Sequence, residues 1–99
     1  MYILQAENIS YIEAVGSFCK LYDDKGSSHV LSQSITSLYE TLNPNHFFRI
    51  NRGHIVNINH ITGMENYFKN RLVLHMRGGK ENIKTSSSTT AKFRIWLES

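Results

Sequence analysis

The sequence contains very little cysteine and proline, and it has no long apolar run. Of its 99 residues, Cys19 is the one cysteine and Pro44 the one proline. One cysteine cannot form a disulfide within the chain, so a disulfide framework is excluded and a reducing, cytoplasmic setting is expected. No apolar stretch approaches the ~18 residues of a membrane span, and the N-terminus lacks the basic and apolar regions of a signal peptide. We therefore expect a soluble cytoplasmic domain that does not associate with membranes.

Residue groupings that carry catalytic or metal chemistry are also missing. Five histidines show no ligand spacing and have no cysteine pair beside them, so no metal site is predicted. No local motif supports Cys19 as a nucleophile, and a lone cysteine in a strand usually acts as a small apolar residue. Gly78–Gly79 predicts a turn rather than a phosphate-binding loop. We therefore predict a protein that is not an enzyme and that needs neither a cofactor nor a metal.

The composition is that of one small globular domain, but its charge is unevenly distributed. Hydrophobic residues make up 40% and charged residues 19% of the chain. Residues 1–44 hold two cations and five acids, a net charge of −3, whereas residues 45–99 hold nine cations and three acids, a net charge of +6. This asymmetry favours a polyanion as partner and predicts that the binding face lies mainly in residues 45–99.

Short runs of β-forming residues, separated by turn residues, dominate the sequence. Within Phe18–Tyr22 the side chains alternate, with Phe18, Lys20 and Tyr22 on one face and Cys19 and Leu21 on the other. The predicted strands are Ile9–Ala14, Phe18–Tyr22, Ser28–Leu31, Phe47–Asn51, Ile55–Ile58, Ile61–Asn66, Arg71–Met76 and Asn82–Lys84, with Tyr2–Leu4 as an additional edge strand. Ile61–Asn66 and Arg71–Met76 are predicted to form a hairpin around Lys69–Asn70.

An amphipathic helix is predicted in the middle of the chain, where apolar residues recur with the spacing i, i+3, i+4, i+7 from Ile35 to Leu42. Ser34 is its N-cap candidate, Ser37 with Glu40 offers an alternative capping box, and Pro44 follows its end. Its exposed face carries no lysine or arginine. We therefore expect it to pack on a sheet rather than to enter a DNA groove.

A second helix is predicted at the C-terminus, where Phe93, Trp96 and Leu97 share one helical face. The strands do not alternate with helices as they would in a parallel α/β fold. The predicted fold class is therefore mainly β, with elongated antiparallel sheets, one short middle helix and a C-terminal helix.

Three stretches give the chain a resemblance to a known family. The first is Ile9-Ser-Tyr-Ile-Glu-Ala14, the second is the middle helix with Leu38 and Leu42, and the third is Phe48-Arg-Ile-Asn-Arg-Gly-His-Ile-Val-Asn57, followed by Ile61. In this order they resemble the LytTR DNA-binding domain, the output domain of many bacterial response regulators. The resemblance covers about residues 2–97, so residues 1–99 are interpreted as one such domain taken from a longer response regulator.

The resemblance implies sequence-specific binding of duplex DNA, with loops rather than a helix inserted into successive major grooves. Carried onto this chain, the loops are Gly16–Lys20, Asn51–His54 and Thr85–Ser88. The resemblance also implies promoter DNA with paired direct repeats, a homodimer on that DNA, and a receiver domain in the full-length protein. The alternative is a protein-interaction or oligomerisation module without nucleic-acid binding, for which Tyr11 and Ile12 would supply apolar surface on both strand faces.

The middle loop contains the residues best suited to contact DNA. Arg52 can donate to guanine O6 and N7 or clamp a phosphate, and Asn51 can pair with adenine N6 and N7. Gly53 permits a close backbone approach and can offer its N–H to a phosphate, and His54 completes the loop. For Arg49 two roles remain open, stabilising the sheet or contacting a phosphate. Asn57, in an apolar run, is interpreted as a structural hydrogen-bonding residue.

The other two loops supply further candidates. Ser17, Cys19 and Lys20 are the candidates in the first loop, where the serine and lysine suit backbone phosphates. Thr85, Ser86 and Ser87 are those in the third loop, where the serine hydroxyls and the following helix N-terminus could bind phosphate.

The chain departs from the family pattern in the same loops. Asn51 stands where the pattern has histidine, Gly53 where it has serine, and His54 where it has an aromatic residue. Ser86-Ser87 replaces a common Ser-Arg pair. Base specificity therefore cannot be transferred from relatives.

Overall fold

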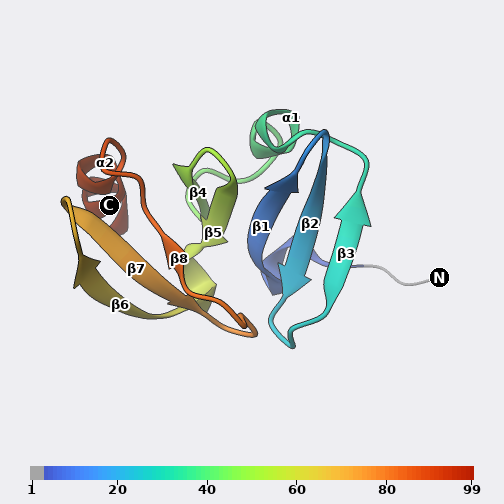
Figure 1. The fold of residues 1–99 in the computed structure, drawn as a ribbon. Helices are drawn as coiled ribbons and strands as arrows, with labels where there is room; N and C mark the ends of the chain where they lie inside the picture. Colours follow the sequence, from blue (N-terminus) through green and yellow to red (C-terminus); the bar gives the residue numbers. More distant parts are fainter. Residues whose placement is uncertain (1–3) are drawn as a thin grey trace.

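In the part of the chain that the structure describes, two antiparallel sheets and two α-helices are joined side by side in an elongated body of 42 × 25 × 24 Å (Figure 1). The computed structural model describes residues 4–99. Apart from Leu4, which lies in a loop, the edge strand predicted at Tyr2–Leu4 falls outside these residues. The predicted fold class is confirmed.

The larger sheet has five strands in the order β3-β2-β1-β5-β4. Its central strand pairs antiparallel with β2 on one side and with β5 on the other. The turn between β1 and β2 contains Gly16, whose φ of 60° lies in the left-handed region that glycine adopts without steric cost. The bounds of these strands are β1 (Ile9–Val15), β2 (Phe18–Asp23), β3 (Ser28–Leu31), β4 (Phe47–Asn51) and β5 (His54–Asn57).

The smaller sheet has the order β6-β7-β8, and α2 follows it in the chain. Its first hairpin turns at Lys69 and Asn70, which have φ of 57° and 58°, as the predicted hairpin requires. The remaining bounds are β6 (Ile61–Tyr67), β7 (Arg71–Met76), β8 (Ile83–Lys84), α1 (Ile35–Tyr39), α2 (Thr90–Leu97) and the short 3-10 turns η1 (Ala6–Asn8) and η2 (Ile58–His60).

The five-stranded sheet has a hydrophobic cluster on each face. On one face Ile12, Cys19 and Ile55 pack with α1. On the other, Tyr11, Ile50 and Val56 pack with the three-stranded sheet and α2. Tyr11 and Ile12 are both buried within the chain, at 6% and 0% exposure. They therefore cannot supply the exposed interface that the protein-interaction alternative assigned to them.

The middle helix is confirmed but is shorter than the apolar spacing predicted. Ser34 is its N-cap, and the Ser34 Oγ accepts the Ser37 N–H at 3.1 Å. After Tyr39 the backbone tightens, because the N–H groups of Thr41 and Leu42 bond three residues back instead of four. Leu42 still packs against the core, so the stripe continues although the α-helix ends.

Asn57 acts as a structural residue, as predicted. Its side chain is buried, its Nδ2 donates to Ile9 O at 2.9 Å, and its Oδ1 accepts from Asn59 N at 3.0 Å. The strand that contains it is displaced by one residue from the prediction. It begins at His54 and ends before Ile58, which starts the turn η2.

The two sheets approach each other closely at Gly78, between β7 and β8. A Cβ atom there would lie 2.7 Å from both Asp23 O and Gly26 N, and its φ is 73°. The residue therefore has to be glycine, and the backbone turns of the two sheets are in direct contact at this point.

Candidate nucleic-acid interface

Three loops that are distant in sequence lie along one edge of the molecule, drawn at the top of Figure 1. The turn after β1 lies beside the turn between β4 and β5, because Ala14 N donates to Gly53 O at 2.8 Å. The loop before α2 joins them, since Ser86 N and Thr89 Oγ1 both donate to Ile50 O, at 2.9 and 2.6 Å. The predicted loops are therefore brought together.

A groove lies where these elements meet. Its walls come from α1, β4, the β4–β5 turn and the loop before α2. The residues that line it are Thr36, Arg49, Asn51, Arg52, Ser86, Ser88 and Thr89.

Asn51 holds the β4–β5 turn in place and joins it to the other sheet. Its Nδ2 donates to Lys84 O at 2.7 Å, while its Oδ1 accepts from Gly53 N at 2.8 Å and lies 3.1 Å from His54 Nδ1. Adenine reading would require these amide groups to leave their protein partners. In this structure Asn51 is therefore a positioning residue.

Arg52 is exposed, and its guanidinium makes no hydrogen bond or ion pair with any of residues 4–99. Arg49, three residues earlier, is used differently: its Nη1 donates to Thr36 Oγ1 at 3.0 Å and its Nη2 donates to Arg52 O. Of the two roles left open for Arg49, the observed contacts are those of a stabiliser. Arg49 thus fixes the backbone from which Arg52 projects.

The backbone of Gly53 is already hydrogen-bonded within the chain. Its N–H is donated to Asn51 Oδ1 and its carbonyl accepts from Ala14 N. The prediction that this N–H is available to a phosphate is therefore wrong. A Cβ atom at Gly53 would have its nearest neighbour at 3.8 Å, so the turn does not require glycine here.

Two predicted contact residues are buried, and the prediction that they touch DNA is corrected. Cys19 is 0% exposed, faces the core of the five-stranded sheet, and its Sγ donates to Gln33 O at 3.1 Å. Thr85 is 1% exposed, and its Oγ1 accepts from Leu72 N at 2.9 Å and lies 2.8 Å from Thr90 Oγ1. Burial raises the pKa of the Cys19 thiol, which keeps it in its neutral form.

The remaining candidates reach the surface. Ser17 and Ser87 are exposed, and Lys20 and Ser86 are partly exposed. The Ser86 hydroxyl lies 2.7 Å from Thr89 Oγ1. The Ser87 hydroxyl donates to Lys69 O at 2.7 Å, which attaches the tip of the β6–β7 hairpin to the loop before α2.

This hairpin tip adds cations that the sequence did not identify as part of the site. Arg71 and Lys84 both lie over the ring of Tyr67, at 4.9 and 5.1 Å from its centroid. Lys69 and the 74%-exposed Phe68 stand at the tip. In the sequence, the only local indication of these cations was the turn predicted at Lys69–Asn70. The contact that links the tip to the loop spans 18 residues and has no sequence signature.

His54 lies at the start of β5, between Asn51 and Glu13. Its Nε2 is 3.6 Å from Glu13 Oε2, and its side chain is 24% exposed. Burial lowers the pKa of His54 below its usual value, while Glu13 and then Glu81 act in the opposite direction.

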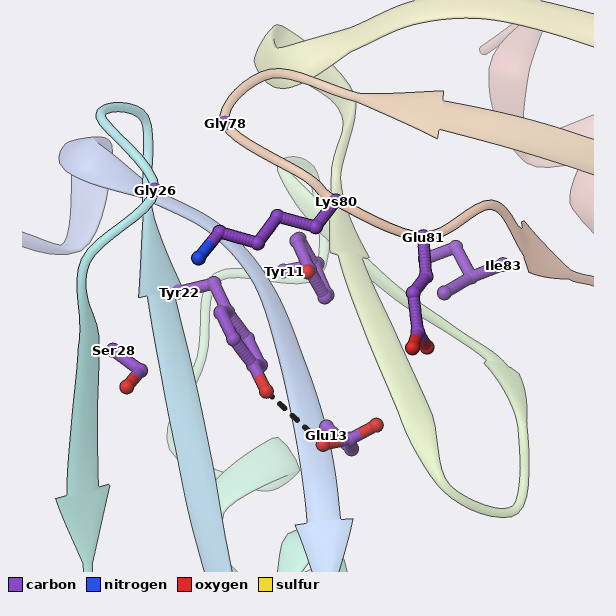
Figure 2. Close-up of a pocket in the computed structure, with 9 residues that line it drawn as sticks. All are labelled: Tyr11, Glu13, Tyr22, Gly26, Ser28, Gly78, Lys80, Glu81 and Ile83. Atoms are coloured by element: carbon purple, nitrogen blue, oxygen red, sulfur yellow. Dashed lines mark hydrogen bonds between the residues drawn. The ribbon is translucent and has the colours of Figure 1, made fainter.

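A cleft of about 240 Å³ lies between the larger sheet and the segment that joins β7 to β8, and Glu13 is one of the residues that line it (Figure 2). Tyr11 and Tyr22 stack in it with ring centroids 4.5 Å apart, and the Tyr22 hydroxyl donates to Glu13 Oε1 at 3.2 Å. Burial, with the charges of neighbouring groups, raises the pKa of Tyr11 to about 12. The cleft therefore contains a neutral tyrosine pair and a carboxylate that also faces the β4–β5 turn.

Residues 4–99 hold no group of three or more histidine, cysteine or acidic side chains placed to bind a metal. Within the same span, no helix is long and apolar enough to cross a membrane.

The fold and the exposed cations define a class, a small β-rich domain in which turns form one exposed edge. A family model, LytTr DNA-binding domain, matches residues 1–98. The chain belongs to this family.

Bacterial relatives and a solved structure agree with this assignment. The transcriptional regulatory protein YpdB is 32% identical over 87 residues in both Escherichia coli (strain K12) and Shigella flexneri. The match covers 88% of this chain and 35% of those proteins. The LytTr DNA-binding domain of a Bacillus cereus protein described as a methyl-accepting/DNA response regulator has a TM-score of 0.84 at 24% identity, covering 95% of this chain and 84% of that one. At this identity the structure supports the fold alone.

Proposed function

We propose that this chain binds duplex DNA in a sequence-specific manner, as the output domain of a bacterial transcription regulator. One observation carries the proposal. The three loops that resemble DNA-contacting loops, drawn from both ends and the middle of the chain, are hydrogen-bonded into a single edge. That edge exposes Arg52, whose guanidinium has no partner among the described residues. An unpaired guanidinium fork fits a phosphate or the O6 and N7 of guanine.

In this proposal the loops enter successive major grooves, with different residues contacting bases and phosphates. Arg52 contacts a base, and Ser17, Lys20, Ser86 and Ser87 contact phosphates. The hairpin tip extends the phosphate-binding surface. Arg71 and Lys84 lie 4.9 and 5.1 Å from the centroid of the Tyr67 ring, and two cations gathered at one ring would attract a polyanion. Asn51, Arg49 and His54 hold the turn.

The partners of the full-length protein are part of the same proposal. We propose a receiver domain that controls this domain, and two copies that bind paired direct repeats in a promoter. This proposal is supported by the family assignment and by the similarity of the chain to part of a bacterial transcriptional regulatory protein. Footprinting would show one protected repeat per copy, and protection of a single repeat by two copies would contradict the arrangement.

Selection from a random duplex library tests the function directly. We expect enrichment of a short motif and an affinity for it that falls with salt, with a log–log slope of about −0.9 for each phosphate contacted. A protein-interaction module would enrich no motif and would show little dependence on salt. That outcome would reject the proposal in favour of the alternative.

A further inference from the structure

A series of polar contacts connects the cleft between the sheets with the β4–β5 turn. In the cleft, the Tyr22 hydroxyl donates to Glu13 Oε1 at 3.2 Å (Figure 2). The other carboxylate oxygen, Oε2, lies 3.6 Å from His54 Nε2. On the opposite side of the imidazole, His54 Nδ1 lies 3.1 Å from Asn51 Oδ1. His54 therefore links a carboxylate to the residue that holds the turn.

Both ring nitrogens of His54 face oxygen acceptors. The Asn51 amide cannot present its nitrogen instead, because its Nδ2 donates to Lys84 O and its Oδ1 accepts from Gly53 N. A neutral imidazole carries one N–H and can donate to just one of its two neighbours. A protonated imidazole can donate to Asn51 Oδ1 and at the same time form an ion pair with Glu13, whose Oε2 lies 3.6 Å from Nε2. The contacts around His54 are thus fully made in its charged form alone.

The charges around His54 come from four elements. Glu13 on β1 and Glu81 after β7 favour its charged form, and burial opposes it. Lys20 is opposite Glu13 across the β1–β2 pair, and Arg52 belongs to the same turn as His54. Because the net result lowers the pKa of His54 below its usual value near 6.5, the imidazole of the unbound chain is mainly neutral at pH 7.

We propose that His54 is a positioning residue that takes up a proton when DNA binds, and that it acts through Asn51 and Glu13 rather than by touching a base. The inference rests on the proposed function. The phosphates of a bound duplex favour a nearby imidazolium. The imidazolium in turn fixes Asn51, and with it the backbone that presents Arg52. It also compensates the charge of Glu13, which would otherwise repel the phosphates.

The direction of the pH dependence follows from this arrangement. In this proposal DNA raises the pKa of His54. At a pH between the His54 pKa of the free chain and that of the complex, the complex therefore carries a proton that the free chain lacks. Affinity therefore increases as pH falls through that interval. Below the pKa of the free chain both states are protonated, and the dependence on His54 levels off.

The matched control lies in the other sheet. His75 on β7 also lies between an asparagine oxygen and a carboxylate, with Nδ1 at 2.8 Å from Asn82 Oδ1 and Nε2 at 2.9 Å from Glu65 Oε2. It does not contact the β4–β5 turn. His54→Gln and His75→Gln each remove one imidazole, but only His54→Gln removes it from beside Asn51.

The test measures Kd for the 99-residue chain and both variants at constant ionic strength, with a short duplex that carries the motif enriched by the selection. From pH 8 to pH 6 we expect the wild-type chain and His75→Gln to gain about threefold to tenfold more affinity than His54→Gln. Titration calorimetry in two buffers of different ionisation enthalpy should show proton uptake by the first two proteins and almost none by His54→Gln. His54→Phe, which restores the aromatic residue of the family pattern, replaces His54→Gln if that variant does not fold.

The outcomes separate the two proposals. Binding with the same pH dependence and proton uptake in wild type and His54→Gln would overturn the role of His54 and leave DNA binding intact. No binding of any duplex at any pH would overturn the proposed function, and this inference with it.

Discussion

Gly16 and Ser17 join β1 to β2 through an exposed two-residue turn, whereas Arg52 and Gly53 join β4 to β5 through a turn that Asn51 and Arg49 hold in place. The first turn depends on the conformation of one glycine. The second is tied to α1, to β8 and to its own backbone. Neighbouring turns of one surface are thus fixed to different degrees. The difference suggests that precise base contact is made by the fixed turn and adaptable phosphate contact by the other.

Removal of the Asn51 side chain, which holds the β4–β5 turn in place, should have the largest effect on stability and on DNA affinity. Asn51→Ala leaves Lys84 O and Gly53 N without their partners, so we expect a loss of about 2–3 kcal/mol in the free energy of unfolding. DNA affinity should fall about tenfold or more, because Arg52 is no longer held in position. Urea unfolding and a binding titration measure the two effects. Asn66→Ala, which loses one 3.4 Å bond to an exposed arginine, is the control.

For Arg52→Ala we expect a loss of DNA affinity with little change in stability. Its side chain is exposed and unpaired among the described residues, so stability should change by less than about 0.5 kcal/mol. Affinity for the selected duplex should fall by about 1–3 kcal/mol, with relaxed preference at one base position. Lys25→Ala, at the other end of the same sheet, controls for the loss of a positive charge. Equal losses in the two variants would mean that Arg52 contributes charge and not base contact.

Local patterns predicted most of the fold. Alternation in Phe18–Tyr22 and the turn residues Lys69–Asn70 act over a few positions, and both elements are where the sequence placed them. The same alternation puts Cys19 on the face of Leu21, which turned out to be the core, so the burial of Cys19 could have been read from it. The helix end after Tyr39 was missed because the apolar stripe continues to Leu42 in a tighter turn.

The candidate site was less predictable than the fold because distant contacts decide it. Thr85 is buried, and its hydroxyl is hydrogen-bonded to Leu72 and Thr90. Lys69 lies beside the loop before α2 because its carbonyl oxygen accepts from the Ser87 hydroxyl. The amide of Asn51 is occupied by Lys84, 33 residues away. Residue type suggested which side chains could contact DNA. Whether each is free to do so depends on pairings that have no local pattern.

Gly53→Ala tests whether the β4–β5 turn requires glycine at this position. The nearest atom to the added Cβ lies at 3.8 Å and no positive φ has to be kept, so we expect stability to rise by about 0.4–1 kcal/mol. Gly78→Ala is the control: its Cβ would meet backbone atoms at 2.7 Å, and it should lose about 1–3 kcal/mol. Thermal unfolding compares them. A loss at Gly53 as large as that at Gly78 would show that the turn is less open than described.

The smallest effect is expected in the turn between β1 and β2. Ser17 is exposed, so Ser17→Ala should leave the free energy of unfolding within about 0.5 kcal/mol of wild type. A hydroxyl that donates to a phosphate contributes about 0.5–1 kcal/mol to affinity, and its loss should be equal for all duplex sequences. Titration against the selected duplex and a scrambled duplex measures this. If Ser17→Ala instead changed base preference as Arg52→Ala does, the weakly held turn would also be reading bases, and the proposed division between the two turns would fail.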